Sequence, residues 1–345
     1  MVKYTIQRLL LAVITTFIIL TATYFLMKML PFPKAVGLET QRLAYYLDQS
    51  TKGFVIDSPV PLSGYEFLES FRNSASGDHY FYVRPAWQQY LNWVSGVLTR
   101  GDWGTSSAIM LNVDAMRIIA LRLPLTIQIN IWSVIISVPA GLGLGIWAAL
   151  KKNTMTDHII STLVMVFISI PSFIIITFLM KWLAYDTGWL PSQWSVARGA
   201  PFSVVARSYV IPVMALSFGS ICGYTRFTRA ELTEVMSSDY LLLARTKGLT
   251  KNQTIVRHAL RNAMVPIIPS ILAEVIGLLS GSMVLESLYG IQGIGQLYIN
   301  AVNSNDYNVL MADMAFYTII GLVAGVFLDL SYGFIDPRIR MGAKK

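Results

Sequence analysis

The chain has 345 residues, of which 54% are hydrophobic and only 13% charged, about half the charged share of an average globular domain, which excludes an ordinary soluble protein. The formal net charge of +8 does not indicate nucleic-acid binding, because the basic residues occur in short segments between apolar runs rather than on one arm or face. A single cysteine, Cys222, excludes a disulfide framework, and three histidines far apart in the sequence argue against a metal site.

The first apolar run, residues 9–30, predicts a retained membrane-spanning helix. It follows Lys3 and Arg8, as the core of a secretory signal peptide follows basic residues. A signal core is about 7–15 residues long, whereas this run is long enough to cross the bilayer, and no small-x-small cleavage site ends it. The run is therefore expected to stay in the protein as its first helix.

The next segment, residues 31–121, is a long loop with one clear helical pattern. Trp87, Leu91, Val94 and Leu98 recur at helical spacing, and Gly101-Asp-Trp-Gly104 then forms a turn. The pattern fits an amphipathic helix on the outer membrane face, and it fits the core of a small external subdomain equally well. Neither alternative implies catalysis.

Five further apolar runs, each near the roughly 20 residues that cross hydrocarbon, predict five more spans. They are residues 123–150, 159–185, 209–227, 264–285 and 311–335. Lys and Arg cluster on the N-terminal side of the membrane, in segments 3–8, 151–152, 226–261 and 338–345, and are absent from 286–310. The positive-inside rule thus predicts cytoplasmic termini and an external 31–121 loop.

The connection between the fourth and fifth spans begins with helix signals. Residues 237–239, Ser-Ser-Asp, can cap a short helix over 240–247, with Arg245 and Lys247 in its last turn beside the negative end of the helix dipole. Gly248 is expected to end this helix in a left-handed conformation, with Leu249 folding back onto the helix.

A second short helix is expected directly after this turn. Thr250 and Gln253 have capping-box spacing, and Ile255, Ala259 and Ala263 share one helical face. Two short helices joined by a glycine turn would form a rigid knob at the cytoplasmic membrane face. From the pattern alone, a passive loop stabilised by its own caps is the simpler interpretation.

Glu274 is a carboxylate inside the fifth span. An ionised group near the bilayer centre costs about 2.5–3.5 kcal/mol on insertion scales, so it should face a cavity or a partner, or be protonated. Lining of a solute path and a structural role near the membrane face both remain open. Ser280 and Glu286 are the other candidates for the path.

The connection between spans four and five resembles a motif of a known transporter family. Tyr240-Leu-Leu-Leu-Ala-Arg-Thr-Lys-Gly-Leu249 and Arg257-His-Ala-Leu-Arg-Asn-Ala263 resemble the cytoplasmic EAA loop of binding-protein-dependent ABC importer permeases, most closely the B-type subunit of the dipeptide, oligopeptide and nickel branch. Short motifs in matching order extend the resemblance over most of the chain. They are Gly101-Asp-Trp-Gly104, Arg122-Leu-Pro-Leu-Thr126, Ser169-Ile-Pro-Ser-Phe173, Gly188-Trp-Leu-Pro191, Thr225-Arg-Phe-Thr-Arg229, Glu286-Ser-Leu-Tyr-Gly-Ile-Gln-Gly-Ile-Gly295 and Asp336-Pro-Arg-Ile-Arg340.

In that family the loop docks into a groove of a cytoplasmic ATPase subunit, so the resemblance implies that residues 240–248 and 251–261 are coupling helices. The residues that it assigns to ATPase coupling are Asp239, Tyr240, Ala244, Arg245, Lys247, Gly248, Leu249, Arg257, His258 and Arg261. Leu242 stands where the general importer motif has its glutamate, and Arg261 stands near where that motif has its proline. The peptide branch often lacks both of these motif residues.

The resemblance also implies an all-α integral membrane protein with the six-helix type I ABC importer permease fold and a long external loop between helices 1 and 2. The expected partners are a second related permease subunit, two cytoplasmic ABC ATPase subunits, an external solute-binding protein and membrane lipid, but no nucleic acid. No metal or cofactor is expected in this chain, since the ATPases would bind ATP and Mg²⁺. The expected location is the bacterial cytoplasmic membrane.

Four segments follow from these expectations. Residues 1–30 form the cytoplasmic end and first helix, 31–121 the external loop, 122–335 the permease core with a coupling loop at 228–263, and 336–345 a cytoplasmic tail.

The expected function is translocation of di- or oligopeptides that the external binding protein delivers. A nickel or metal-chelate importer is an alternative within the same class. An ion-coupled secondary transporter is an alternative of another class, although the two halves show no inverted repeat. The sequence has no Gly-x-x-x-x-Gly-Lys-Ser/Thr phosphate loop and no legible catalytic constellation, so this chain is expected to be a non-catalytic subunit.

Overall fold

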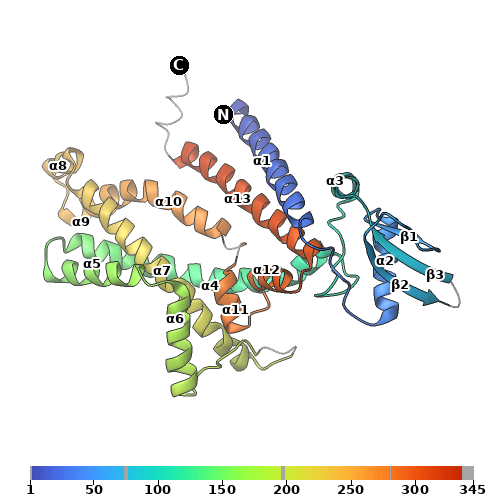
Figure 1. The fold of residues 1–345 in the computed structure, drawn as a ribbon. Helices are drawn as coiled ribbons and strands as arrows, with labels where there is room; N and C mark the ends of the chain where they lie inside the picture. Colours follow the sequence, from blue (N-terminus) through green and yellow to red (C-terminus); the bar gives the residue numbers. More distant parts are fainter. Residues whose placement is uncertain (1, 74–76, 196–198, 278, 280, 336–345) are drawn as a thin grey trace. The chain divides into compact units, whose positions relative to one another are not determined.

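A computed structural model describes residues 2–73, 77–195, 199–277, 279 and 281–335. The described chain is mostly helical (Figure 1) and divides into two compact units. Unit 1 comprises Met1–Pro124 and Gly293–Leu322, and unit 2 comprises Leu125–Gln292 and Val323–Lys345. The predicted tail 336–345 lies outside the described residues, and the predicted segment bounds stay predictions.

Long apolar helices dominate the chain. In the part of the chain that the structure describes, five helices are long and apolar enough to cross a membrane: Thr5–Lys28 within α1 (Val2–Lys28), α4 (Ala115–Leu150), α7 (Phe202–Met236), Lys251–Gly277, and Tyr307–Ser331 within α13 (Tyr307–Ile335). A bent pair, Met155–Ile168 with Ser172–Asp186, makes a sixth span if it is counted as one. The prediction of a helical membrane protein with about six spans is confirmed.

The third predicted span, 159–185, is broken rather than straight. Helix α5 (Met155–Ile168) and helix α6 (Ser172–Leu179), which continues as the π-helix η1 (Met180–Asp186), meet at a bend of 96°. Pro171 stands at the break, with a ψ of 143° that no helix interior adopts. Proline offers no N–H and disfavours helical geometry in the residue before it, so the chain must turn here. Beyond the bend, Ile176 and Leu179 are buried in a cluster shared with α7.

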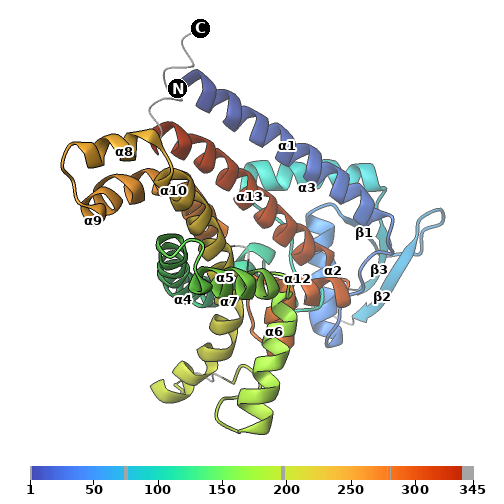
Figure 2. The same ribbon diagram turned by 90° about the vertical axis from the view of Figure 1, so that its left-hand side faces the viewer.

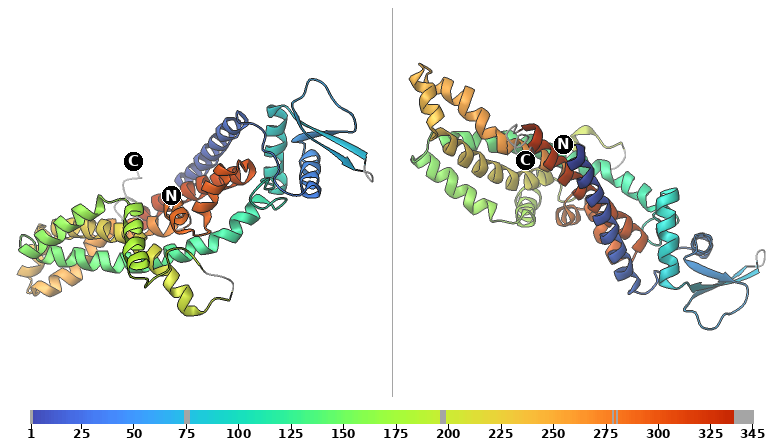
Figure 3. Two further views of the ribbon diagram at one scale, coloured as in Figure 1. Left: turned by 60° about the horizontal axis from the view of Figure 1, so that its bottom comes forward. Right: turned by 90° about the horizontal axis from the view of Figure 1, so that it is seen from above.

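Part of unit 1 is a small subdomain within the predicted 31–121 loop. Strands β1 (Val55–Ser58), β2 (Phe67–Asn73) and β3 (Gly77–Val83) form an antiparallel sheet in the order β1-β3-β2. The strands, α2 (Glu39–Thr51) and α3 (Ala86–Arg100) form one group in both views of Figure 3. The sheet is an addition to the expected all-helical fold.

The core of this subdomain is aromatic. Tyr45 and Tyr46 from α2 are fully buried, and Tyr46 stacks on Phe81 of β3 with 5.2 Å between ring centroids. Phe71 of β2 packs edge-on against Phe81 at 5.9 Å. Burial raises the pKa of the Tyr45 and Tyr46 phenols, so both stay neutral and contribute to packing. The structure therefore contains a small folded subdomain within residues 31–121.

The predicted apolar face of α3 is not what builds that core. Trp87, Leu91 and Leu98 are 59%, 56% and 76% exposed, whereas Trp93 on another face of the helix is only 6% exposed. Trp93 packs against Trp103 at 5.9 Å between centroids. Of the predicted stripe, only Val94 packs against the core, which otherwise uses the Trp93 side of α3. The alternative of an amphipathic helix on the outer membrane face stays a prediction.

The fifth predicted span, 264–285, is displaced toward the N-terminus. Helix α10 ends at Gly277, and its helical path begins at Lys251 through α9 (Lys251–Thr254) and the π-helix η2 (Ile255–Ala259). The predicted connection 286–310 holds helix α12 (Ile294–Asn303) and most of α11 (Met283–Tyr289). The apolar run therefore predicts correctly that a span is present, but it does not predict where the helix begins and ends.

A buried carboxylate in unit 1 ties two distant segments together. Asp306, immediately before α13, is fully buried. Its carboxylate accepts bonds from the Ser106 hydroxyl (2.5 Å) and from the amides of residues 107, 108 and 109 (3.2, 3.1 and 3.1 Å). The chain after the Gly101–Gly104 turn is thereby fixed to the start of the last membrane helix.

Candidate functional site

The connection between α7 and α10 in unit 2 begins with a short helix, α8 (Asp239–Thr246). Gly248 follows with a φ of +91°, in the left-handed region that favours glycine. Its amide donates to the Arg245 carbonyl at 3.0 Å, and the Leu249 amide donates back to the Ala244 carbonyl at 3.4 Å. The predicted left-handed end of this helix is confirmed.

Of the two helix starts predicted in this connection, the one at Thr250 is confirmed and the serine cap of α8 is not. The Gln253 amide donates to Thr250 Oγ1 at 3.3 Å, and the Thr250 amide donates to Gln253 Oε1 at 3.1 Å, so the predicted capping box is confirmed. Ser238 occupies the N-cap position of α8, but its hydroxyl donates to the Val235 carbonyl at 2.6 Å instead. The predicted serine cap of α8 is therefore wrong, and Asp239 alone favours the first turn through its charge.

The second predicted short helix, 251–261, is not a separate element. Residues 251–277 form one helical path through α9, η2 and α10. No proline or glycine occurs between Thr250 and Met264, so the helix that the capping box starts continues into the span. The knob consists of helix α8, the turn at Gly248, and the first helical turns after Lys251, which continue into the fifth span.

A small apolar cluster in unit 2 anchors the buried side of helix α8. Leu241 is 4% exposed and lies in a cluster with Ala149 of α4, Leu232 of α7, Ala259 and Ala263. The predicted common face of Ile255, Ala259 and Ala263 is buried as expected. A polar contact adds to this anchoring, since Asn262 Nδ2 donates to the Tyr240 hydroxyl at 3.0 Å. The alanines allow close helix approach, which holds α8 in a fixed orientation.

The outer surface of α8 is apolar and open. Leu242 and Leu243 are 63% and 57% exposed, and Tyr240 is 43% exposed. Ala244 and Leu249 are half-buried, while Gly248 is exposed. Five basic side chains of the same connection are also exposed: Arg245, Lys247, Arg257, His258 and Arg261. Exposed apolar and basic side chains together suit the docking of another protein.

The candidates for a solute path lie in three different settings. Glu274 in α10 is half-buried and accepts a hydrogen bond from Ser220 Oγ of α7 at 2.6 Å. Glu286 in α11 is 3% exposed and accepts from Thr126 Oγ1 at 3.0 Å. Ser280 lies outside the described residues. The structure pairs both carboxylates with neighbouring helices, and their role in a path stays a prediction.

The backbone at Gly281 passes close to the Glu286 carboxylate. Gly281 has a φ of +62°, and a Cβ placed there would lie 2.5 Å from Glu286 Oε1 and 2.8 Å from Thr126 Cγ2. Only glycine fits both the conformation and the space. Two of the short sequence motifs, which begin at Arg122 and Glu286, therefore meet in space at this point.

A buried ion pair in unit 2 was missed by the sequence analysis. Asp157 of α5 is fully buried and accepts two bonds from Arg229 of α7, at 2.5 Å from Nε and 2.8 Å from Nη2. The Asn153 amide and the Ser161 hydroxyl complete its shell at 3.0 and 3.2 Å. The sequence carries one signal of this pair. Asp157 stands just before the apolar run 159–185, and Arg229 stands just after the apolar run 209–227.

Among the residues that the structure describes, no three His, Cys, Asp or Glu side chains come together in an arrangement that could hold a metal ion.

Comparison with known protein families decides the class of the chain. The family described as "Binding-protein-dependent transport system inner membrane component" matches residues 141–341, which is more than half of the chain and includes α8, the glycine turn and α10. The chain belongs to this family. It is thus an inner-membrane, multi-pass component of a transport system and not an enzyme, as predicted.

Similar proteins extend the likeness to the whole length. The dipeptide transport system permease protein DppB of Lactococcus lactis subsp. cremoris is 33% identical over 99% of this chain and 100% of its own length. DppB of Bacillus subtilis is 33% identical over 77% of this chain and 83% of its own. The oligopeptide transport system permease protein OppB of Escherichia coli K12 is 28% identical over 99% of this chain and 100% of its own.

Among solved structures, an inward-facing MetNI methionine ABC transporter chain shows a weak likeness. The TM-score is 0.47 and the sequence identity 16%, over 63% of this chain and 97% of that chain. Family membership itself implies that this inner-membrane component works with a binding protein and with ATPase partners.

Proposed function

We propose that this chain is the permease subunit of an ATP-binding-cassette importer that moves di- or oligopeptides across the cytoplasmic membrane. The observation that carries the proposal is 33% identity to a dipeptide permease over 99% of this chain. An external solute-binding protein delivers the peptide, and partner ATPase subunits drive its passage. ATP and Mg²⁺ are bound by those ATPases, not by this chain.

The knob built from α8, Gly248 and the first turns of the fifth span is the ATPase docking surface in this proposal. Leu242, Leu243 and Tyr240 supply exposed apolar contact area, and the exposed basic side chains of the same connection supply positive charge for contacts with the partner. Leu241 anchors α8 to helices α4 and α7, so movement of a docked ATPase is transmitted to membrane helices. A rigid anchor is required because a loose loop would absorb the movement.

The working assembly contains two related permease subunits, two ATPases and one external binding protein. Both termini and the knob lie in the cytoplasm, in accordance with the distribution of Lys and Arg. Glu274 and Glu286 are candidates to change their contacts as the permease alternates between outward- and inward-facing states.

Reconstitution tests the transport function. Proteoliposomes that contain the full complex should take up labelled alanyl-alanine or penta-alanine only when ATP and the binding protein are both present. Uptake driven by an ion gradient without ATP would contradict the importer assignment. Uptake of a nickel chelate in place of both peptides would contradict the substrate class but leave the ATP-driven mechanism.

Substitution of the exposed α8 surface tests the docking function. Leu243→Glu should abolish pull-down of the ATPase and peptide-stimulated ATP hydrolysis, because a charge replaces apolar contact area. The side chain is 57% exposed, so the fold of the chain should not suffer. Leu38→Glu is the matched control, since Leu38 is 70% exposed but lies in the predicted external segment. Equal ATPase binding by both variants would remove α8 from the docking surface.

A further inference from the structure

An apolar stripe on α3 remains exposed after the subdomain has folded. It consists of Trp87, Leu91 and Leu98, which lie on one side of the helix and are each more than half exposed. Large apolar side chains gathered on one helix face require an apolar environment, because exposing them to water is unfavourable. The question is which environment covers this stripe.

Helix α3 lies against α1 (Figure 2), and three of its side chains contact successive turns of α1. Gln89 accepts a hydrogen bond from Lys28 Nζ at 2.5 Å, at the end of α1. Trp93 packs on Tyr24 with 5.1 Å between ring centroids, one turn further in. The Tyr90 hydroxyl bonds Thr21 Oγ1 at 2.8 Å, almost one turn further again.

These contacts define which side of α3 faces α1. Gln89 and Trp93 are one turn apart on α3, and their partners Lys28 and Tyr24 are one turn apart on α1, so the two helices run side by side over this stretch. At 100° per residue, a rotation of about 60–100° from Tyr90, away from Gln89, reaches Trp87, Leu98 and Leu91. The exposed stripe therefore flanks the contact with α1, next to Tyr90.

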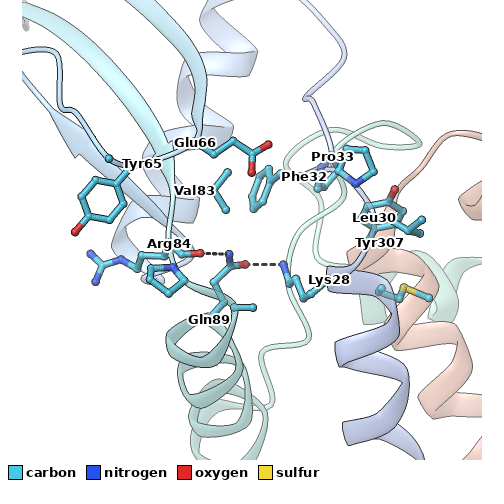
Figure 4. A pocket seen from close by; sticks show the side chains of 15 residues that line it. Lys28, Leu30, Phe32, Pro33, Tyr65, Glu66, Val83, Arg84, Gln89 and Tyr307 are labelled. Atoms are coloured by element: carbon cyan, nitrogen blue, oxygen red, sulfur yellow. Dashed lines mark hydrogen bonds between the residues drawn. The ribbon is translucent and has the colours of Figure 1, made fainter.

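The opposite side of α3 faces the chain just before the sheet. Rotation from Gln89 in the other sense reaches Asn92, whose Nδ2 donates to the Gly53 carbonyl at 2.8 Å, just before β1. Figure 4 shows the chain of bonds at this level, from Lys28 to Gln89 and from Gln89 Nε2 to the Arg84 carbonyl at 2.6 Å. Polar groups thus hold the sheet side of α3 at the level where the span ends.

The depth of α3 is set by the same contacts. Thr21 is seven residues from Lys28, so the Tyr90 contact lies about 10 Å inside the end of the span. An interfacial amphipathic helix buries its apolar face about 5–10 Å into the boundary between headgroups and acyl chains. The apolar surface is also continuous with α1, since Phe25 is 42% exposed and packs on Tyr90 at 5.0 Å.

We propose that α3 is an interfacial helix whose Trp87, Leu91 and Leu98 side chains enter the membrane, so that the small subdomain rests directly on the bilayer. The occupant of the stripe is lipid. Tryptophan is enriched at this boundary because its ring is amphipathic, and Trp87 at the start of the stripe fits that preference. The inference depends on α1 being a membrane span and is independent of the transported solute.

Lipid and aqueous quenchers test this contact directly. The full-length chain with Cys222→Ser would carry one cysteine, at Leu91→Cys or Leu98→Cys, labelled with the fluorophore NBD in phosphatidylethanolamine–phosphatidylglycerol nanodiscs. Thr99→Cys is the matched control, because Thr99 is exposed on the same helix and lies about 80–100° around it from Leu91 and Leu98, next to Asn92. The labels at 91 and 98 should show blue-shifted emission and a severalfold higher ratio of quenching by doxyl-lipid to quenching by iodide than the label at 99.

Two outcomes would overturn the proposal. Iodide quenching of the labels at 91 and 98 equal to that at 99 would place the stripe in water. Shielding of these labels from both quenchers would show that protein, such as a second subunit, covers the stripe. Since all three positions are exposed, the labelled chains should elute from size exclusion as the parent does, which checks the fold in each preparation.

Discussion

Gly248 is the residue that sets the direction of the chain between α8 and the fifth span. A side chain in the left-handed region costs about 1–2 kcal/mol, and a β-branched residue is among the least tolerant. Gly248→Val should therefore reorient the end of α8, weaken ATPase pull-down and abolish peptide-stimulated ATP hydrolysis. Membrane levels should stay near those of the parent, because a Cβ at this position meets nothing within 4 Å.

Gly248→Asn provides the control for conformation, since asparagine tolerates the left-handed region better than other residues with a side chain. It should retain most of the coupling. A valine variant that couples as well as the asparagine variant would show that the turn does not transmit force.

The ion pair of Asp157 and Arg229 is a second feature at the residue scale. Asp157 is fully buried and the Arg229 side chain is 32% exposed, so Asp157→Asn removes the charged partner of a partly hydrated arginine. Breaking a fully buried pair on one side costs about 3–5 kcal/mol, and the exposure of Arg229 makes the expected loss smaller than that. The purified variant should melt at a clearly lower temperature in detergent, as followed by circular dichroism.

An exposed pair in the same broken span gives the comparison. Lys181 and Asp186 bond at 2.8 Å, but their side chains are 69% and 48% exposed, and such pairs contribute about 0–1 kcal/mol. Asp186→Asn should leave the melting temperature almost unchanged. Replacing Asp157 and Arg229 together by leucine and methionine should recover part of the loss. Equal melting of Asp157→Asn and Asp186→Asn would refute the structural role of the buried pair.

At the scale of elements, the start of α13 is joined to the segment after the Gly101–Gly104 turn by Asp306. Its carboxylate accepts one hydroxyl and three amide donors, and each buried donor left without a partner costs about 1–3 kcal/mol. Asp306→Ala should therefore release this segment. Hydrogen exchange at the amides of residues 107–109 should become much faster, while exchange in the centre of α13 stays slow.

Asp78→Ala is the control for this prediction, because Asp78 is an exposed carboxylate of the same subdomain. It should leave exchange at 107–109 at the parent rate. Unchanged exchange in Asp306→Ala would mean that other contacts hold the segment.

At the scale of the whole molecule, the distribution of Lys and Arg predicts the orientation in the membrane. In a Cys222→Ser background, a cysteine at Ser63 should react in intact cells with a membrane-impermeant maleimide, and one at Ser237 should react only after the cells are opened. Both side chains are exposed, so accessibility on the protein does not limit the reaction. The reverse pattern would invert the topology and place the proposed docking knob outside the cell.

Sequence alone determined the features that depend on composition and on residues close together in the chain. About six apolar runs gave the number of spans, since crossing hydrocarbon requires a fixed length of apolar helix. Gly248 gave the left-handed turn, and Thr250 with Gln253 gave the capping box, because these structures are made by bonds within a few residues. The full-length similarity to peptide permeases lies at this level too.

Tertiary structure decided what depends on long-range packing. The pairs Asp157–Arg229 and Thr126–Glu286 join residues 72 and 160 positions apart, and no local pattern specifies such partners. The 96° bend places α6 against α7, although a straight span fits the apolar run equally well. Both the Trp87 and the Trp93 sides of α3 are apolar, and only the competition for the aromatic core determined that Trp93 would be buried and Trp87 left exposed.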